Sequence, residues 1–367
     1  TITLPSPAGG FADPYSGLPG GNPFPQPLPP PADAVFPMGG QFINLPSQIR
    51  LPYMQQWNIN VQRQIGADWL VSANYLGNKG THRWLIIDAN PGIYIPGTCG
   101  SQPCSTTGNV NNRRLLTLLN PTEGRKFSSL ATVDDGGNNS YHGLLLSVNR
   151  RLQSHFSVLA NYTWSHCLSE GGDLQSEITV ATQNPYDRGS ERGNCQTDVR
   201  HLFNLSLVAE TPHWRGNLLK AVISDWELAP IVTKRSGYWF SVSSGRDNSL
   251  TGIGADRADI VGNPSVDDPT LNRWFNTSAF IANKPGQFGN AGRNILEGPG
   301  AFNMDIALMR RIRISERHSV QIRVEAFNFL NHPNFGNPRS SLSDTNFGRI
   351  LSANDPRILQ FALKYTF

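Results

Sequence analysis

The four cysteines are the residues whose spacing most clearly suggests chemistry. Cys99 and Cys104 are separated by four residues, and Cys167 and Cys195 flank a stretch rich in Gly, Ser and Glu. Neither spacing resembles a zinc site, and metal binding or free thiols are the alternatives to disulfides. We expect two disulfides in an oxidising compartment, Cys99 with Cys104 and Cys167 with Cys195. The second would tie the base of a loop if the strands on either side of it are neighbours.

An acidic, a basic and an imidazole side chain stand close together in "TDVRH", at Asp198, Arg200 and His201. This spacing could support acid–base chemistry, but no positioned nucleophile accompanies it. Asp198 and Arg200 share a strand parity, so we expect a structural ion pair near the rim of a sheet. The sequence therefore predicts no catalytic residues and no enzyme.

Two short loops resemble ligand-binding turns only in part. "GIGADR", Gly252–Arg257, has Arg257 at the third glycine position of a dinucleotide-binding turn and lacks the flanking strand and helix patterns. "DDGGNN", Asp134–Asn139, offers oxygen ligands but lacks the terminal glutamate of a calcium loop. We expect a turn at 134–139, with calcium binding as the alternative, and we predict no cofactor and no metal site.

Composition limits the classes of protein that the chain could form. Of 367 residues, 16% are charged, 35 are Gly and 27 are Pro, a profile suited to many strands joined by irregular connections. The net charge of +4 is small and is not gathered in one segment, which gives little support for nucleic-acid binding. No apolar run approaches the roughly 18 residues of a membrane-spanning helix.

Alternating side chains identify the elements that must position these residues. The last residues are an example, because Leu359, Phe361, Leu363, Tyr365 and Phe367 share one parity and polar residues occupy most of the other. This period of two predicts a β-strand with two different faces. The same test predicts nine strands, around residues 57–61, 69–75, 144–148, 156–164, 203–209, 226–232, 302–308, 320–326 and 359–367.

Short turns alternate with long connections between these strands. The long ones cover about residues 79–140, 168–198, 237–300 and 331–356. Transmembrane barrels have short periplasmic turns and long extracellular loops, whereas compact soluble domains rarely contain several such loops. The sequence therefore predicts an all-β fold, an antiparallel transmembrane β-barrel segment of about nine long strands.

The two strand faces differ in chemistry as a barrel wall requires. Aromatic residues lie near strand ends on the apolar parity, as in the girdles that border a bilayer. The other parity is polar, and we interpret Arg311, Arg313, Arg323 and Glu325 as candidates for the lumen. The alternative is a soluble β-sandwich with its polar face outward, whose core would contain too many tryptophans. The aromatic residues are Trp57, Trp69, Tyr75, Tyr162, Trp164, Trp226, Tyr365 and Phe367.

Residues 1–50 are dominated by Pro, Gly and polar residues, which cannot sustain a helix or a strand ladder. We therefore divide the chain into a lead-in, residues 1–50, and a barrel region, residues 51–367.

An ordered series of motifs resembles one family over most of the chain, from about residue 20 to Phe367. The family is that of the Oar-like TonB-dependent receptors, outer-membrane proteins with an N-terminal carboxypeptidase-regulatory-like domain. The motifs are "PYMQQWNINVQRQIGADWLVSANYLGNKGTH", "YHGLLLSVNRRLQSHFSVLANYTWSHC", "NPYDRGSERGNCQTDVRHLFNLSLVAE", "WFNTSAFIANKPGQFGNAGRNILEGPG" and "QIRVEAFNFLNHPNFGNP".

The resemblance implies a barrel of typically 22 strands, a plug inside it, and an N-terminal segment that meets TonB. The sequence contains nine strands and no recognisable plug, and it begins at Thr1, so we expect it to be the C-terminal part of a longer receptor. Its function would be binding and uptake of an unknown extracellular ligand at the outer membrane. The alternatives are a non-transporting adhesin or structural barrel, and a soluble lectin-like sandwich.

The chain end suggests two further partners. A final strand that ends in an aromatic residue resembles the signal read by the outer-membrane assembly machinery, here Tyr365 and Phe367. The apolar parity would contact outer-membrane lipid.

Overall fold

The computed structural model describes residues 10, 12–16, 39–153, 155–171, 182–214, 216, 218–254, 256–315 and 317–367. Most of the lead-in expected at residues 1–50 lies outside the described residues, and its division from the barrel region stays a prediction. Within the described ranges, no helix is both long and apolar enough to cross a membrane.

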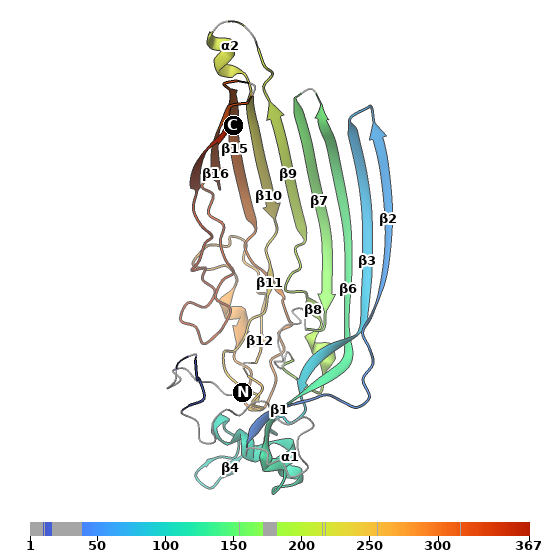
Figure 1. The fold of residues 1–367 in the computed structure, drawn as a ribbon. Helices are drawn as coiled ribbons and strands as arrows, with labels where there is room; N and C mark the ends of the chain where they lie inside the picture. The colour runs from blue at the N-terminus through green and yellow to red at the C-terminus, as the bar shows by residue number, and fades with distance from the viewer. Residues whose placement is uncertain are drawn as a thin grey trace.

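One large antiparallel sheet dominates the structure (Figure 1). Its nine long strands are ordered β17-β16-β15-β10-β9-β7-β6-β3-β2, and the sheet is not closed, since β2 and β17 are its edges. The strands are β2 (Tyr53–Ile65), β3 (Trp69–Asp88), β6 (Phe127–Gln153), β7 (Phe156–Ser169), β9 (His201–Glu210), β10 (Trp226–Arg235), β15 (Ala301–Arg313), β16 (Ser319–Phe327) and β17 (Ile358–Thr366).

Shorter elements surround this sheet. β1 (Gly40–Asn44) pairs in parallel with β6, so the expectation that residues 1–50 form no strand ladder is wrong at this segment. β8 (Gly193–Asn194) pairs with β7. Three small antiparallel pairs join β4 (Thr98–Cys99) to β5 (Gln102–Pro103), β11 (Trp239–Phe240) to β14 (Leu296–Glu297), and β12 (Asp259–Ile260) to β13 (Phe280–Ile281). The helices are α1 (Leu115–Leu119), α2 (Leu218–Ile223) and the 3-10 turns η1 (Thr107–Arg113), η2 (Gly124–Lys126), η3 (Arg188–Glu191) and η4 (Thr277–Ala279).

All nine strands expected from the alternation are confirmed, but two are longer than expected. β3 continues to Asp88 and β6 begins at Phe127, so both ends of the connection expected at 79–140 are a paired ribbon, and the loop between the strands is 89–126. The turn expected at "DDGGNN" is therefore wrong, because Asp134–Asn139 lies inside β6. Register shifts near Thr81, Arg83 and Leu85 change the parity, which hid the continuation of the strand from a strict period of two.

The connections lie at two opposite ends of the strands. The turns between β2 and β3, β6 and β7, β9 and β10, and β15 and β16 lie together at one end, which we call the turn edge (Figure 1). The longer connections, including α1, β4, β11 and β12, lie at the other end, the loop edge. This separation is the one that the alternation of short and long connections predicts.

Neighbouring rows of side chains give the sheet two chemically distinct faces. One row across six adjacent strands is apolar, and the row one residue along each strand is polar, so the two rows project to opposite faces. Direct cross-strand partners form the apolar row Val71, Val148, Ala160, Leu205, Val232 and Met304, and the polar row Ser72, Ser147, Asn161, Asn204, Thr233 and Asn303.

Aromatic residues border the apolar face at both ends of the strands. Trp69 and Trp226 lie near the turn edge, whereas Trp57 and Trp164 lie nearer the loop edge. Three tyrosines form hydrogen bonds with histidines, with Oη to Nδ1 distances of 2.7–2.8 Å. These bonds give each phenol group a polar partner beside an apolar surface. These pairs are Tyr75 with His142, Tyr162 with His201, and Tyr365 with His318.

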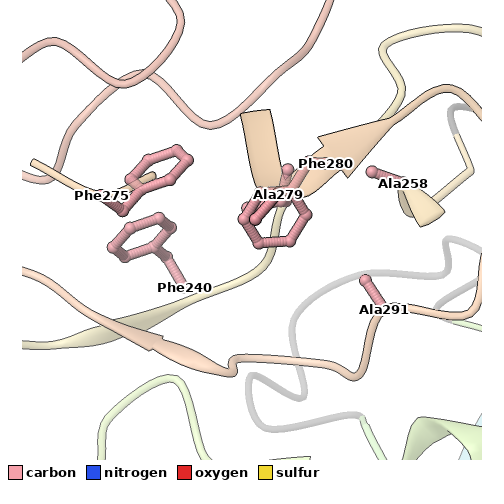
Figure 2. Close-up of a cluster of buried hydrophobic side chains, with 7 residues drawn as sticks. Phe240, Ala258, Phe275, Ala279, Phe280 and Ala291 are labelled. Atoms are coloured by element: carbon pink, nitrogen blue, oxygen red, sulfur yellow. The ribbon is translucent and has the colours of Figure 1, made fainter. Parts of the chain in front are cut away.

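The main buried hydrophobic cluster lies in the loops rather than between layers of sheet. Phe275 lies between Phe240 and Phe280 (Figure 2), with ring centroids 5.9 Å and 5.7 Å away. The ring centroid of Phe347 is 5.2 Å from that of Phe275. Val242, Ala258, Ala279 and Ala291 complete it. Because these residues come from 237–300 and 331–356, the two long connections pack into one unit, which we call the loop cap.

Candidate ligand-binding site

A pocket of about 500 Å³ lies on the polar face, near the loop edge. It spans four neighbouring strands of the sheet, from β2 to β7, and the segment that precedes β9. Its lining residues are Pro52, Tyr53, Met54, Gly80, Arg83, Trp84, Asn139, Cys167, Cys195 and Thr197.

The floor of the pocket is set by strand register. Met54 pairs with Gly80, and Gly80 pairs with Asn139, so the three residues form one row across β2, β3 and β6. A Cβ atom at Gly80 would overlap Oδ1 of Asn139, and only glycine leaves this space open. That Oδ1 atom is buried and has no hydrogen-bond partner among the described residues. The floor thus contains an amide oxygen that the protein covers without pairing it, which costs free energy.

The disulfide between Cys167 and Cys195 forms one wall, with its Cα atoms 5.4 Å apart. The pairing is the one expected from the sequence, because β7 and β9 are neighbours and both sulfurs lie at the loop edge. Asp198 supports this wall, since its carboxylate accepts hydrogen bonds from the Cys167 amide at 2.8 Å and from Arg200 Nη2 at 3.3 Å. The expected ion pair of Asp198 with Arg200 is confirmed.

Aromatic residues form the opposite side. Trp84 is fixed by a hydrogen bond from its Nε1 to the carbonyl oxygen of Arg50 at 2.9 Å, and Arg50 in turn pairs with Asp135. The Tyr53 ring lies 5.7 Å from the His82 ring. Both aromatic residues are about half exposed, which leaves surface for stacking against a ligand.

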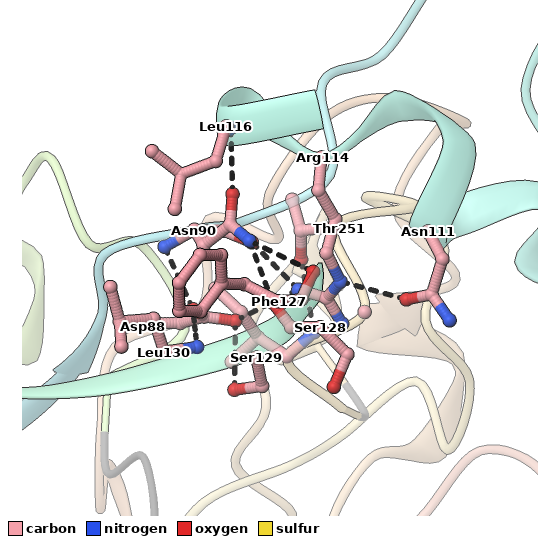
Figure 3. Close-up of polar contacts among 12 residues, drawn as sticks. Asp88, Asn90, Asn111, Arg114, Leu116, Phe127, Ser128, Ser129, Leu130 and Thr251 are labelled. Carbon is pink, nitrogen blue, oxygen red and sulfur yellow. Dashed lines mark hydrogen bonds and ion pairs between the residues drawn. The ribbon is translucent and has the colours of Figure 1, made fainter. Parts of the chain in front are cut away.

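A buried polar network holds the ends of the β3–β6 ribbon (Figure 3). Asp88 accepts hydrogen bonds from the amides of Asn90 and Leu130 and lies 3.3 Å from Arg114 Nη1. Arg114 also donates to the carbonyl oxygen of Asn90 at 2.7 Å. Burial lowers the pKa of the Arg114 guanidinium, and Asp88 counteracts this shift.

A buried ion pair joins the loop that contains Cys195 to the loop cap. Glu191 Oε2 lies 2.7 Å from Arg257 Nη1, and both side chains are nearly inaccessible. Arg293 of the cap also donates to the carbonyl oxygen of Glu191 at 2.7 Å and to the Ser169 carbonyl oxygen at 2.6 Å. The cap and the wall of the pocket are therefore mechanically connected.

One carboxyl group of the cap is buried with neutral partners. Asp256 accepts hydrogen bonds from the Ser249 amide at 2.6 Å and from Asn283 Nδ2 at 2.9 Å. Burial raises the pKa of Asp256, and the charge of Asp247 acts in the same direction, while these hydrogen bonds oppose the shift.

The remaining residues singled out in the sequence lie elsewhere. Cys99 and Cys104 form a disulfide across the β4–β5 pair, with Cα atoms 4.8 Å apart. Arg323 forms an ion pair with Glu325 two residues along β16, and the roles of both in a lumen stay a prediction. Arg311 and Arg313 lie at the end of β15 and do not line this pocket.

The C-terminal residues are ordered but largely exposed. Tyr365 contacts His318 at the turn edge, and Phe367 is 87% exposed, with its ring 6.0 Å from that of Tyr365. The assembly role of Tyr365 and Phe367 stays a prediction.

Several residues of the site carried no recognisable signal in the sequence. Gly80 and Asn139 are 59 positions apart, and their contact depends on the register of β3 with β6. Glu191 and Arg257 belong to loops without periodicity, so only their charge could have drawn attention. The continuation of the hydrophobic residues through "RWLIID", Arg83–Asp88, was the available hint that β3 is long.

Chemically, the arrangement suits binding rather than a reaction. The pocket combines two aromatic rings and a guanidinium, and a disulfide braces one of its walls. Such groups orient a ligand by stacking and hydrogen bonding.

Comparisons with known proteins agree with the type of fold. Residues 2–360 match the family model described as "Outer membrane beta barrel domain". A search of curated proteins found no match.

Among solved structures, the chain is similar to the outer membrane transporter YddB from Escherichia coli, with 9% identity, 90% of this chain and 34% of that chain covered, and a TM-score of 0.48. It is also similar to BauA, the ferric preacinetobactin receptor from Acinetobacter baumannii, with 9% identity, coverages of 86% and 29%, and a TM-score of 0.43. The chain spans about a third of the length of these two proteins.

Proposed function

Because the chain belongs to the outer membrane beta barrel domain family and is located in the bacterial outer membrane, we propose that it forms the wall and loops of a TonB-dependent receptor of the Oar-like type. Such a receptor binds an extracellular ligand and releases it into the periplasm. The series of motifs that resembles this receptor family supports the proposal, as does the division of the sheet into two faces.

The single observation that carries the proposal is the pair of adjacent rows across six strands. Val71 to Met304 are apolar on one face, and Ser72 to Asn303 are polar on the other. A wall with lipid on one side and a hydrated passage on the other needs this division, whereas a structure with two apolar faces would have no passage. Thr233 Oγ1 donates to Asn204 Oδ1 at 3.2 Å within the polar row.

We assign ligand contact to the pocket above Gly80 and Asn139. It lies on the polar face, near the loop edge, where an incoming ligand would first meet the passage. TonB would act through a region upstream of this chain, and the outer-membrane assembly machinery would insert the barrel.

The test places a larger side chain at Gly80, which fills the pocket, and compares the small molecules that the two proteins retain. The full-length protein and its Gly80→Val variant are incubated with concentrated growth medium, washed, and analysed for bound small molecules by mass spectrometry. We expect one retained species that the variant loses. The matched control is Gly262→Val, a loop glycine where a Cβ would meet only ordinary contacts. Retention that is equal in all three proteins would reject the assignment of the pocket.

Uptake requires a second comparison. Cells with and without a functional TonB should differ in accumulation of the retained species. If the species binds in the pocket but accumulates equally in both strains, the binding assignment stands and the transport function is rejected.

The second candidate function is adhesion without transport. Apolar side chains of the loop cap are exposed, with Val261 57% and Leu351 51% accessible, which favours contact with another surface. In that case, cell adherence would depend on these residues and not on TonB.

A further inference from the structure

A second pocket lies on the polar face, at the loop-edge ends of β10, β15, β16 and β17, and its volume is about 510 Å³. Among the described residues that line this pocket and the one near Gly80, none is shared, and no strand contributes to both. The volume falls in the range of about 300–1,000 Å³ that is common for small-molecule sites. The residues placed to contact a ligand are Asn303, Asp305, Phe327, Asn334, Asn354 and Asp355.

Strand register places the polar groups of the sheet on one face. Thr233 pairs with Asn303 in the polar row, and Asp305 lies two positions further along β15, so its side chain projects to the same side. Asp305 Oδ1 accepts hydrogen bonds from Asn303 Nδ2 and from the Asn328 amide, both at 2.8 Å. The second carboxylate oxygen of Asp305 is not buried and has no hydrogen-bond partner among the described residues, so it is available to a ligand.

An apolar patch lies beside these groups on the same face. Phe327 stands directly opposite Ile358 in the β16–β17 pairing, and 40% and 50% of their surfaces are exposed. Their face is fixed by Glu325, which lies two positions before Phe327 and pairs with Ala307 on the parity of Asp305. An exposed ring next to hydrogen-bonding groups supplies a platform for the apolar side of a ligand.

A rim from the loop cap completes the pocket. Asn334 Oδ1 accepts a hydrogen bond from the Phe302 amide at 2.7 Å, and the Asn334 carbonyl oxygen accepts one from the Asn354 amide, also at 2.7 Å. Asn328 Nδ2 donates to the carbonyl oxygen of Asp355 at 3.4 Å. These bonds hold the main chain of the rim. The side chains of Asn354 and Asp355 are exposed and have no hydrogen-bond partner among the described residues.

The charges of the pocket disfavour an anionic ligand. Among the described residues, Arg235 is the one cationic side chain that lines it, against the carboxylates of Asp305 and Asp355. The Arg235 guanidinium carbon lies 4.1 Å from the ring centroid of Tyr238, and its Nη1 donates to the Ser236 carbonyl oxygen at 3.2 Å. The groups left for a ligand are therefore carboxylate oxygens, which accept, and amides, which both donate and accept. A hydroxyl group also donates and accepts, so a ligand rich in hydroxyl groups matches both.

We propose that this pocket binds a neutral oligosaccharide. The carboxylates of Asp305 and Asp355 accept hydrogen bonds from sugar hydroxyl groups. The Asn354 amide pairs with a neighbouring hydroxyl group, and the C–H face of a sugar ring packs on Phe327. The proposal requires that the polar face is hydrated. It does not depend on transport or on the pocket near Gly80, so either pocket could be inactive while the other functions.

The experiment measures binding to the full-length protein in nonionic detergent, by saturation-transfer NMR and by the shift of the thermal unfolding midpoint. The probes are the neutral trisaccharides maltotriose, cellotriose, raffinose and triacetylchitotriose, with trigalacturonate as an anion and spermidine as a cation. We expect at least one neutral trisaccharide to bind at millimolar concentration, and neither trigalacturonate nor spermidine to bind. If none of the neutral trisaccharides binds, the proposal is wrong, and binding of spermidine in their place would assign the pocket to a cation.

Two variants locate the bound trisaccharide. Asn354→Ala/Asp355→Ala removes side chains that form no hydrogen bond with other described residues, and Phe327→Ala removes the ring that the sheet contributes. Each variant should bind about tenfold more weakly, the effect of one or two lost hydrogen bonds or of a lost apolar contact. Heat-dependent gel mobility checks that each variant is folded, and if one fails to fold, the other decides the question.

The matched control is Asp267→Ala/Asp268→Ala, which removes two exposed side chains of the loop cap that do not line the pocket. It should retain binding. Equal loss in this control and in Asn354→Ala/Asp355→Ala would overturn the assignment. Loss of trisaccharide binding in Gly80→Val but not in Asn354→Ala/Asp355→Ala would also overturn it, because the sugar would then occupy the other pocket.

Discussion

The carboxylate of Asp198 accepts a hydrogen bond from the backbone amide of Cys167 at 2.8 Å, across the 31 positions that separate them in the chain. The bond lies beside the disulfide to Cys195 and joins the end of β7 to the segment that enters β9. A covalent and a charge-assisted contact therefore hold the same wall of the candidate pocket.

Removal of this disulfide should loosen the wall. The bridge closes a loop of 28 positions, for which chain entropy gives a contribution of about 3–4 kcal/mol. We expect the Cys167→Ser/Cys195→Ser variant to show faster hydrogen exchange at residues 195–200, with the wall strands unchanged. Cys99→Ser/Cys104→Ser is the control, since it should affect only the β4–β5 pair. Exchange at 195–200 that is unchanged would contradict the structural role of the bridge.

Replacement of Glu191 should release the loop cap from the wall. The variant Glu191→Gln leaves Arg257 buried without a carboxylate, and loss of one partner of a buried ion pair costs about 3–5 kcal/mol. Protease cleavage of the cap should become at least tenfold faster in intact outer membranes. The control Glu123→Gln breaks an exposed pair with Lys126, where we expect less than about 1 kcal/mol. Similar cleavage of both variants would refute the prediction.

Truncation of Phe275 should unfold the cap while the sheet persists. Phe275 is 2% exposed and contacts three other phenylalanines, so Phe275→Ala should cost about 3–5 kcal/mol. The measurement is protease sensitivity of residues 237–300, together with the heat-dependent gel mobility that reports an intact barrel. Phe329→Ala, at a position 41% exposed, is the control. If both properties were lost together, the cap and the sheet would form one folding unit.

The stability of the cap should depend on pH through Asp256. Because burial raises the pKa of Asp256 above its unfolded value, the folded cap binds this proton more tightly than the unfolded cap does. The stability that this proton contributes to the folded cap is fully present below the ordinary aspartate pKa of about 3.9. It is lost as pH rises through the raised pKa of Asp256.

Hydrogen exchange near Asp256, corrected for the intrinsic effect of pH, measures this dependence. Protection in the wild type should decrease as pH rises through that window, relative to Asp256→Asn, which carries no ionisable group. Asp267→Asn, at an exposed loop position, should follow the wild type. A difference between wild type and Asp256→Asn that is the same at every pH would argue against a buried, titrating carboxyl group.

Deletion of Phe367 should impair insertion into the outer membrane. The residue is exposed and contributes little packing, so a severe defect would point to recognition during assembly rather than to stability. We expect a severalfold decrease in the heat-modifiable form in isolated outer membranes, and we expect Phe367→Tyr to retain most of it. Normal assembly without Phe367 would exclude a role in the signal.

The sequence by itself determined the nine strands and the character of their two faces. Alternation is a local property, since consecutive side chains of any strand point to opposite sides, and residues such as Val71 and Ser72 reveal their faces without knowledge of their partners. The disulfide partners followed from the same pattern, because Cys167 and Cys195 end and precede neighbouring strands.

Only the tertiary structure decided the sites. The ligand pocket depends on the register that places Gly80 beside Asn139, and register is fixed by the whole pairing of β3 with β6 rather than by either residue. The loop cap has no periodicity, and its stability comes from contacts such as Phe275 with Phe347 and Glu191 with Arg257, each between residues more than 60 positions apart. Such contacts depend on strands that bring the loops to one edge, and no local pattern encodes them.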